Sequence, residues 1–330
     1  MIRALSALSL STLCLLLLVS TGGEALAAAG ALEISHVCAV QTGCFSGDSP
    51  GYPVTVDGAA GSAFVLTSEL VVPDANTIGI SIESSEITID MNGFRIVRSG
   101  CENMTTSCTP ASGTGHGIAV DDYLNRRGTQ LMNGSVVGVG GYGVFLGPNS
   151  QVSSLQVRWN AQIGVYAHDY SAVRHVRAIE NGSQGISIGA SSSVVESVAI
   201  GNVYAGIFTA TGCEVERNAA FDNGQYGIRS AIGSVIRHNA VSDSDSMGGV
   251  LAPSSVVSGN AVSRTAGGPG ISASQGSLVE SNVVYDTTGV GLSLGSDTGY
   301  RENALDANVS GDVTGGINLG ANGCGAAICP

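Results

Sequence analysis

Apolar and polar positions along this chain repeat with a period of about 21 residues. A glycine followed by an aliphatic residue recurs with successive spacings of 26, 21, 21, 21, 21, 22, 21, 21 and 25, at Gly117, Gly143, Gly164, Gly185, Gly206, Gly227, Gly249, Gly270, Gly291 and Gly316. Nine residues after the glycine a second apolar position recurs, at Val173, Val194, Val215 and Ile236. A regular repeat of this length indicates a solenoid in which each repeat forms one coil.

The residues within a repeat alternate over short stretches and show no helical period, which predicts short strands. Each coil is expected to turn through about three strands, each paired in parallel with its equivalent one coil away, at roughly 4.8 Å. The sequence therefore predicts an all-β fold, a single-stranded parallel β-helix of about ten coils.

Asparagines follow the same period in two rows. One row is Asn218, Asn239, Asn260, Asn282 and Asn303, and the other is Asn160, Asn181, Asn202 and Asn223. We expect ladders that close the corners of the coils, with Gly and Asn at positions that need a positive φ or a side-chain bond to buried backbone.

The chain divides into three segments. Residues 1–27 are typical of a signal peptide, with Arg3, an apolar run from Leu8 to Ser20 and a small-x-small site at Ala25-Leu26-Ala27. That run is too short for a comfortable membrane span, so no span is expected once the signal is removed. Residues 28–116 are expected to form an N-terminal cap and irregular first coils, and residues 117–330 the regular coils. The mature protein is expected in the periplasm, at the cell surface or secreted.

Six cysteines form three local couples, Cys38/Cys44, Cys101/Cys108 and Cys324/Cys329. Short loops of this kind are joined by disulfides in exported proteins, so three disulfides are predicted, one of them fastening the C-terminal end. Metal ligation is the alternative. Cys213 is left over and is expected to fill a buried apolar position.

The composition limits which classes of molecule this protein could bind. The 330 residues include 13 Lys+Arg, all of them arginine, and 26 Asp+Glu, giving a formal net charge of −13. With 43% hydrophobic and 12% charged residues, the chain is unlike a disordered protein. Nucleic acid is excluded as a partner because no basic patch is present to neutralise phosphates.

Several segments resemble secreted bacterial proteins with right-handed parallel β-helix repeats, the pectate-lyase-like fold. They are the coils over residues 117–319, the stretch Ile87-Thr88-Ile89-Asp90-Met91-Asn92-Gly93-Phe94, and the entry segments Gly43-Cys44-Phe45, Pro53-Val54-Thr55-Val56 and Phe64-Val65-Leu66-Thr67. The resemblance implies a right-handed parallel β-helix. It does not imply one activity, since the fold occurs in pectate lyases, polygalacturonases, alginate lyases, epimerases and adhesins.

A row of outward side chains is predicted two residues after each glycine. It comprises Ala119, Phe145, Tyr166, Ser187, Phe208, Arg229, then Val250 or Leu251, Ser272, Ser293 and Asn318. Sugar rings stack on aromatic faces, so Phe145, Tyr166, Phe208 and Arg229 are candidates for binding a polysaccharide. Cross-strand stacking that only stabilises the sheet is the alternative.

The turn after this row holds a polar cluster with candidate catalytic residues Asp122, His168 and Asp169. A base beside a carboxylate could abstract a proton from a uronate, and paired acids roughly two coils, about 10 Å, apart would suit inverting hydrolysis. The Gly147-Pro148-Asn149 stretch between them is expected to leave a shallow gap. Solvated turn residues are the alternative.

Enzyme motifs of the fold are incomplete. Gly115-His116-Gly117 followed by Asp121-Asp122 is similar to part of the polygalacturonase pattern, in which the paired aspartates precede Gly-His-Gly and an Arg-x-Lys is required. A chain without lysine has no Arg-x-Lys, which weakens that assignment.

Two further rows carry charge. His175, Glu196, Arg217 and His238 are expected to form a solvated charge ladder. Glu180, Asp222, Asp243 and Asp286 form an acidic stripe that could bind Ca²⁺ weakly, although Gly201 and Arg264 interrupt it. No metal site or other cofactor is predicted.

The sequence thus favours an exported, non-catalytic protein that binds carbohydrate or another cell-surface partner. The alternatives are a lyase, epimerase or glycoside hydrolase acting on acidic or neutral glycans, and a purely structural surface rod. The sequence leaves the oligomeric state open.

Overall fold

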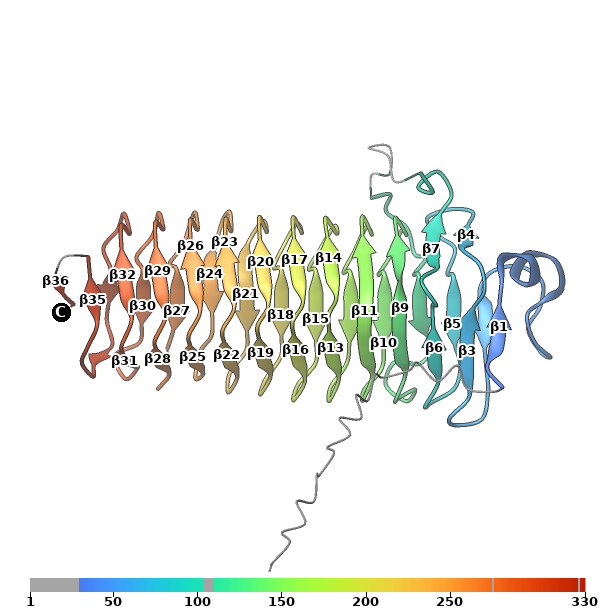
Figure 1. Cartoon of the computed structure of the whole chain (residues 1–330), viewed down its shortest axis with the longest axis horizontal. Helices are drawn as coiled ribbons and strands as arrows, with labels where there is room; N and C mark the ends of the chain where they lie inside the picture. The colour runs from blue at the N-terminus through green and yellow to red at the C-terminus, as the bar shows by residue number, and fades with distance from the viewer. Residues whose placement is uncertain (1–29, 104–107, 109, 275, 326, 330) are drawn as a thin grey trace, which may run out of the picture.

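The computed structural model describes residues 30–103, 108, 110–274, 276–325 and 327–329, so the predicted signal peptide lies outside the described residues. Over these residues the chain is a parallel β-helix whose coils stack into a rod, with the first strand near one end and the last near the other (Figure 1). The predicted fold class is confirmed. The sheet with one strand per coil has 12 strands rather than about ten, because two coils precede Gly117 in the same stack.

Each coil contributes to three faces. Face 1 is the 12-stranded sheet of β2 (Val54–Val56), β5 (Ile80–Ile82), β8 (Ile118–Val120), β10 (Val144–Leu146), β12 (Val165–Ala167), β15 (Ile186–Ile188), β18 (Ile207–Thr209), β21 (Tyr226–Ser230), β24 (Gly248–Leu251), β27 (Ile271–Ala273), β30 (Leu292–Leu294) and β33 (Val313–Thr314).

Faces 2 and 3 are the two halves of the 24-stranded sheet. Face 2 contains β1 (Leu32–Ile34), β3 (Ala63–Leu66), β6 (Thr88–Asp90), β13 (Ala172–Arg174), β16 (Ser193–Val195), β19 (Glu214–Glu216), β22 (Val235–Arg237), β25 (Val256–Ser258), β28 (Leu278–Glu280), β31 (Gly299–Arg301) and β34 (Ile317–Asn318). Face 3 contains β4 (Leu70–Val72), β7 (Arg95–Arg98), β14 (Arg177–Ile179), β17 (Val198–Ile200), β20 (Ala219–Phe221), β23 (Ala240–Ser242), β26 (Ala261–Ser263), β29 (Val283–Tyr285), β32 (Ala304–Asp306), β35 (Gly323–Cys324) and β36 (Ala327–Ile328). The longer β9 (Gln130–Val137) and β11 (Gln151–Arg158) span both.

Side chains of the three faces meet in one continuous core. On face 1 the first and third residues of a strand point inward, as Val165 and Ala167 do. On faces 2 and 3 the middle residue points inward, as Val173 and Ala178 do, and all four are fully buried. The predicted apolar position nine residues after each glycine is therefore a core position on face 2.

Three left-handed residues turn most of the regular coils. In the coil that starts at Val165 they are Tyr170 (φ 60°), His175 (φ 53°) and Glu180 (φ 50°). The expectation that Asn and Gly fill these positions is only partly right, because charged residues occupy many of them and the asparagine follows directly, as Asn181 follows Glu180. The short side chain is needed inside the corner, where it bonds to backbone, and the left-handed residue points outward.

The two asparagine ladders are confirmed. The Asn218 side chain donates from Nδ2 to Oδ1 of Asn239 at 3.1 Å and to the Val194 carbonyl at 2.8 Å, and its backbone N–H donates to the same Oδ1 at 2.9 Å. Asn160 heads the second ladder with a 3.0 Å bond from Nδ2 to Asn181 Oδ1. Because every member is buried and donates from Nδ2 to a backbone carbonyl, as Asn223 does to Ala199, each ladder satisfies a line of corner backbone groups.

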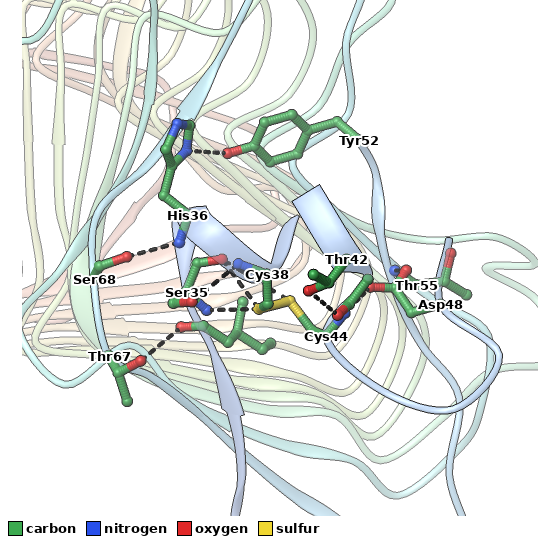
Figure 2. The surroundings of a disulfide bond; sticks show 12 residues. Ser35, His36, Cys38, Thr42, Cys44, Asp48, Tyr52, Thr55, Thr67 and Ser68 are labelled. Carbon is green, nitrogen blue, oxygen red and sulfur yellow. Dashed lines mark hydrogen bonds between the residues drawn. A yellow bond between two sulfur atoms is a disulfide. The ribbon is translucent and has the colours of Figure 1, made fainter. Parts of the chain in front are cut away.

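The N-terminal cap covers one end of the core (Figure 2). A five-residue π-helix, Cys38–Thr42, is closed by the Cys38–Cys44 disulfide, and its Ala39 lies fully buried in the core. The side chains of His36 and Tyr52 point toward one another, with 3.0 Å between Nδ1 and the phenol oxygen (Figure 2). Burial raises the pKa of Tyr52 to about 12, so the phenol keeps a proton to donate at neutral pH. A cap of this kind keeps the first parallel strands from pairing with other molecules.

All three predicted disulfides are present, Cys38–Cys44, Cys101–Cys108 and Cys324–Cys329. Cys213 is a free, buried cysteine in the core, as expected. Among the described residues no helix is long and apolar enough to cross a membrane.

Candidate functional site

The predicted outward row runs along face 1. Strand pairing places Ala119 beside Phe145, Phe145 beside Tyr166, and Phe208 beside Arg229, with Ser187 between Tyr166 and Phe208. Further along, the row continues through Leu251, Ser272 and Ser293. Of the two alternatives at this coil, Val250 and Leu251, the outward residue is therefore Leu251.

The prediction that Asn318 is the last member of this row is wrong. Thr314, not Asn318, pairs with Ser293, and Asn318 lies on face 2 opposite Tyr300. The cause is a change of register in the final coil: Leu292 donates its N–H to the carbonyl of Asp312, at the place where preceding coils have the repeated glycine. Gly316 therefore continues the sequence spacing but not the structural position.

Six rings form what we call the aromatic patch, with Phe145 at its centre and His168 reaching it through Tyr123 and Tyr166: His116, Tyr123, Tyr142, Phe145, Tyr166 and His168. Ring centroids lie 5.1 Å from Phe145 for Tyr142, 5.3 Å for Tyr166, 5.4 Å for Tyr123 and 5.7 Å for His116. Tyr142 is nearly parallel to Phe145, with 12° between the ring planes. These distances are typical of stacked aromatic groups, and the patch is a broad apolar surface.

The sequence analysis did not predict that His116 and Tyr142 belong to a binding surface. His116 and Tyr142 each precede the repeated glycine of their coil, at the edge of face 1. The Tyr142 N–H donates to His116 Nδ1 at 2.9 Å, and burial lowers the pKa of His116. The imidazole is therefore held neutral. An aromatic residue directly before the glycine in two successive coils was the available signal.

Tyr123 reaches the patch from the turn after β8. Gly147 makes this possible, since a Cβ there would lie 1.9 Å from the Arg126 carbonyl oxygen and 2.9 Å from that of Tyr123. The turn packs directly onto the end of β10. The shallow gap expected over Gly147 is therefore filled by backbone.

The candidate catalytic residue Asp122 lies in the same turn, exposed to solvent. Its carboxylate accepts a hydrogen bond from Asn125 Nδ2 at 2.7 Å, which lowers the pKa of Asp122 below its usual value. The neighbouring Asp121 pairs with Arg126 at 3.0 Å. A general acid needs a raised carboxyl pKa, so Asp122 is unsuited to that role.

His168 and Asp169 follow β12. His168 Nδ1 lies 3.4 Å from Asp169 Oδ1, yet it makes no hydrogen bond to any described group although it is shielded from solvent. The two atoms are close without being aligned for a bond. Asp169 Oδ1 instead accepts the Ala190 N–H at 2.8 Å. The pair is thus not arranged as a base with an orienting carboxylate.

Phe208 and Arg229 form a separate group. Ser187, only 5% exposed, interrupts the row of rings between Tyr166 and Phe208. The Arg229 guanidinium lies 5.3 Å from the centre of the Phe208 ring, within range of a cation–π contact. The four predicted binding residues are therefore divided between the patch and this smaller pair.

A cavity of about 580 Å³ lies around the corner from the patch, between β9, β11 and β13. Its polar lining includes Gln130, Gln151 and Arg174, with the exposed Tyr170 at its edge. Tyr170 also borders a second cavity of about 350 Å³ further along the rod. The sequence analysis missed this groove because its residues come from a corner and not from one repeated position.

The charged rows consist largely of ion pairs. Glu196 lies 2.9 Å from His175 and 3.0 Å from Arg217, as expected for a charge ladder, although these residues stand at the left-handed corner rather than on the sheet. In the acidic stripe, Asp243 pairs with Arg264 at 2.6 Å. Within the described ranges no group of three or more His, Cys, Asp or Glu side chains could hold a metal ion.

The fold and the site define the chain as a parallel β-helix repeat protein. Residues 178–322 match the family model described as periplasmic copper-binding protein (NosD). No curated protein matches the chain in sequence.

Solved structures show the same fold at low identity. The A-module of the mannuronan C-5 epimerase AlgE6 from Azotobacter vinelandii is 13% identical, with a TM-score of 0.54 over 79% of this chain and 90% of that chain. The Dettilon tailspike protein is 13% identical, with a TM-score of 0.60 over 81% of this chain and 61% of that one. The Agl-KA catalytic domain is 12% identical, with a TM-score of 0.54 over 82% of this chain and 60% of that one.

The residues present do not fit a copper centre. Copper is held by clustered imidazole, thiolate or thioether groups. The described histidines are dispersed over the cap and separate coils, with His116 Nδ1 already accepting a backbone N–H and His175 paired with Glu196. The described cysteines other than the buried Cys213 are joined in disulfides. We therefore derive no copper chemistry for this chain.

Proposed function

We propose that this protein is a non-catalytic carbohydrate-binding protein that uses the aromatic patch. The observation that carries the proposal is the position of Phe145, with four other rings within 5.7 Å of it on one side of the rod. Sugar rings present C–H faces that pack against aromatic faces, and the surrounding hydroxyls need polar partners at the rim. Tyr123, Tyr142 and Tyr166 supply phenol groups, and Asp121 and Asp169 supply acceptors.

The charge around the patch favours a neutral glycan. Asp121 and Asp122 directly precede Tyr123 in the chain, Asp169 directly follows His168, and Arg126 is already paired with Asp121. His116 is held neutral by burial. The protein as a whole carries a formal charge of −13, so a polyuronate would be repelled at long range as well.

The comparisons support an extracytoplasmic, polysaccharide-related role. The matching family model is described as periplasmic, and one structural neighbour is a mannuronan epimerase. The three disulfides agree with an oxidising compartment.

The alternative is a polysaccharide-active enzyme at Asp122, His168 and Asp169. Its support is the 3.4 Å approach of His168 to Asp169 beside the rings of Tyr123 and Tyr166. Against it stand the lowered pKa of Asp122 and the missing hydrogen bond between His168 and Asp169.

Calorimetric titration of the purified chain with neutral and uronate oligosaccharides tests both, with mass spectrometry of the same mixtures to detect products. Binding of a neutral oligosaccharide without turnover, weakened by Phe145→Ala, is the expected result. Shortened or unsaturated products that disappear in His168→Ala would establish the enzyme instead. Tight binding of polyuronates alone would contradict the proposal that the ligand is a neutral glycan. If no glycan bound, the proposed function as a whole would be overturned.

A further inference from the structure

The outer surface of face 3 carries a strip of large apolar side chains. Each of its strands has its middle residue in the core, so the first and third residues point outward. In β14, β17 and β20 these outward residues include Ile179, Val198, Ile200 and Phe221, all partly exposed. Four large apolar side chains on three successive strands exceed what a solvated sheet face normally shows.

The chain covers the same row at its N-terminal end. Val97 of β7 and Val137 of β9 occupy the third, outward position, and both are fully buried. They lie in a small cluster with Cys101 and Cys108, which are joined by a disulfide. Trp159 packs against this cluster. The row is thus covered by the chain as far as β9. Arg158 follows Val137 in the row, and Ile179, Ile200 and Phe221 continue it with exposed area.

The next two strands of face 3, β23 and β26, are complementary in size. The outward residues of β23 and β26 are Ala240, Ser242, Ala261 and Ser263. Ser242 and Ser263 are each 7% exposed, so these two strands are shallow where β17 and β20 are raised, whereas β29 (Val283–Tyr285) beyond them carries the exposed Val283 and Tyr285.

The two ends of face 3 are complementary in charge. Arg158, whose guanidinium lies 3.6 Å from the centre of the Trp159 ring, and Arg177 lie on the outer side at the end near β11. Asp306 lies on the outer side of β32 at the other end. Acidic residues at the rim are engaged by their own neighbours, Asp243 by Arg264 and Glu180 by the indole N–H of Trp159 at 2.8 Å.

We propose that face 3 is the interface of a homodimer in which two rods pack face to face with their long axes antiparallel. A two-fold axis along the strands, between β20 and β23, places β20 opposite the partner's β23, β17 opposite β26, β14 opposite β29 and β11 opposite β32. Phe221 then faces Ser242, Ile200 faces Ser263, and Arg158 faces Asp306 of the second copy. The Cys101–Cys108 disulfide, which packs on Val97 of β7 and Val137 of β9, lies outside these eight facing strands.

The size of the face suits a reversible dimer. Eight strands at about 4.8 Å extend over about 38 Å, and with a width of about 15 Å the two surfaces together amount to roughly 1,100 Å². This is just below the usual range of stable interfaces, so we expect a weak, concentration-dependent dimer.

Sedimentation of the purified chain over a range of concentrations is the first test. The wild type is expected to dimerise, and Phe221→Glu to raise the dissociation constant by about 100-fold or more, because a carboxylate would be buried without a partner. Val256→Glu, at an outward valine of face 2, is the matched control and is expected to leave the dimer intact. A wild-type monomer at all concentrations, or a dimer that Phe221→Glu does not weaken, would overturn the proposal.

Charge reversal provides a second test that does not depend on an apolar-to-charged change. Arg158→Asp and Asp306→Arg are each expected to raise the dissociation constant at least about tenfold, and the double variant to restore it to within about threefold of wild type. If the dissociation constant of the double variant stayed as high as in the single variants, Arg158 and Asp306 would not face each other in the dimer.

Cross-linking tests the antiparallel direction. Val198→Cys and Ala261→Cys lie three coils apart in one chain, about 14 Å, too far for an internal disulfide, but face each other across the dimer. The double variant is expected to form covalent dimers on mild oxidation, and Val198→Cys alone is not. Covalent dimers from Val198→Cys alone would indicate parallel rods and contradict the proposed arrangement.

Discussion

The rings of Phe145 and Tyr166 lie 5.3 Å apart with an angle of 26° between their planes, and their backbones are paired partners on neighbouring strands of face 1. The strand spacing of the sheet therefore sets the spacing of the rings. Because the backbone on both sides is hydrogen-bonded into a continuous ladder, the two rings form a platform that needs little ordering before a ligand binds.

Phe145→Ala is expected to weaken glycan binding by about 10- to 100-fold, since it removes the central ring and loosens the four around it. Phe208→Ala is the matched control, because Ser187 separates Phe208 from the patch, and its effect should stay within about threefold. Calorimetric titration of both variants measures the difference. Equal losses for the two would mean that the binding surface extends along the whole row.

His116 is expected to make stability depend on pH. Its pKa in the folded protein lies below the ordinary 6.5 because of burial, so the unfolded chain binds the proton more readily. The stabilisation is fully present above pH 6.5 and is lost as the pH falls from there toward the folded-state pKa. Denaturant unfolding between pH 5 and pH 8 should show this loss in the wild type and a smaller one in His116→Gln. Parallel curves for the two proteins would contradict the assignment.

Asn239→Ala is expected to lower the free energy of unfolding by about 2–3 kcal/mol, because Asn218 loses its acceptor and the buried Val215 carbonyl loses its donor. Asn125→Ala removes an exposed hydrogen bond and should change stability by less than about 0.5 kcal/mol. Denaturant titration followed by circular dichroism gives both values. A small effect of Asn239→Ala would show that water replaces the ladder at little cost.

Replacing Cys101 and Cys108 by serine is expected to lower the free energy of unfolding by about 2–3 kcal/mol, through the loss of loop closure. The same change should loosen the cover over Val97 and Val137 and increase binding of a hydrophobic dye. The double serine variant at Cys324 and Cys329 is the control, since neither of those cysteines belongs to the cluster around Val97. Equal dye binding by the two variants would mean that the loop does not shield this row.

Sequence reasoning recovered the local features well where a single repeated position was involved. The period placed Phe145, Tyr166 and Arg229 in one row, and it identified both asparagine ladders, because parallel pairing in register turns a sequence spacing into a spatial neighbour. It failed at Asn318, where the final coil has a different length and the same spacing no longer gives the same position.

Other features depend on contacts between different positions of the repeat. Tyr123 joins Phe145 only because Gly147 lets a turn from the preceding coil lie over β10. The lack of alignment between His168 and Asp169 likewise follows from the bond that Asp169 makes to the next coil.

The sequence alone determined the β-helix, its period, its disulfide pairs and its asparagine ladders, because each depends on residues that recur at a constant spacing or lie close along the chain. Only the tertiary structure decided which rings meet in the aromatic patch, that Asp122 stays ionised, and that the outer row of face 3 is covered at Val97 and Val137 but not at Phe221. These depend on how turns and loops of unequal length pack across coils, and packing distances of a few ångströms are not encoded in a spacing of residues.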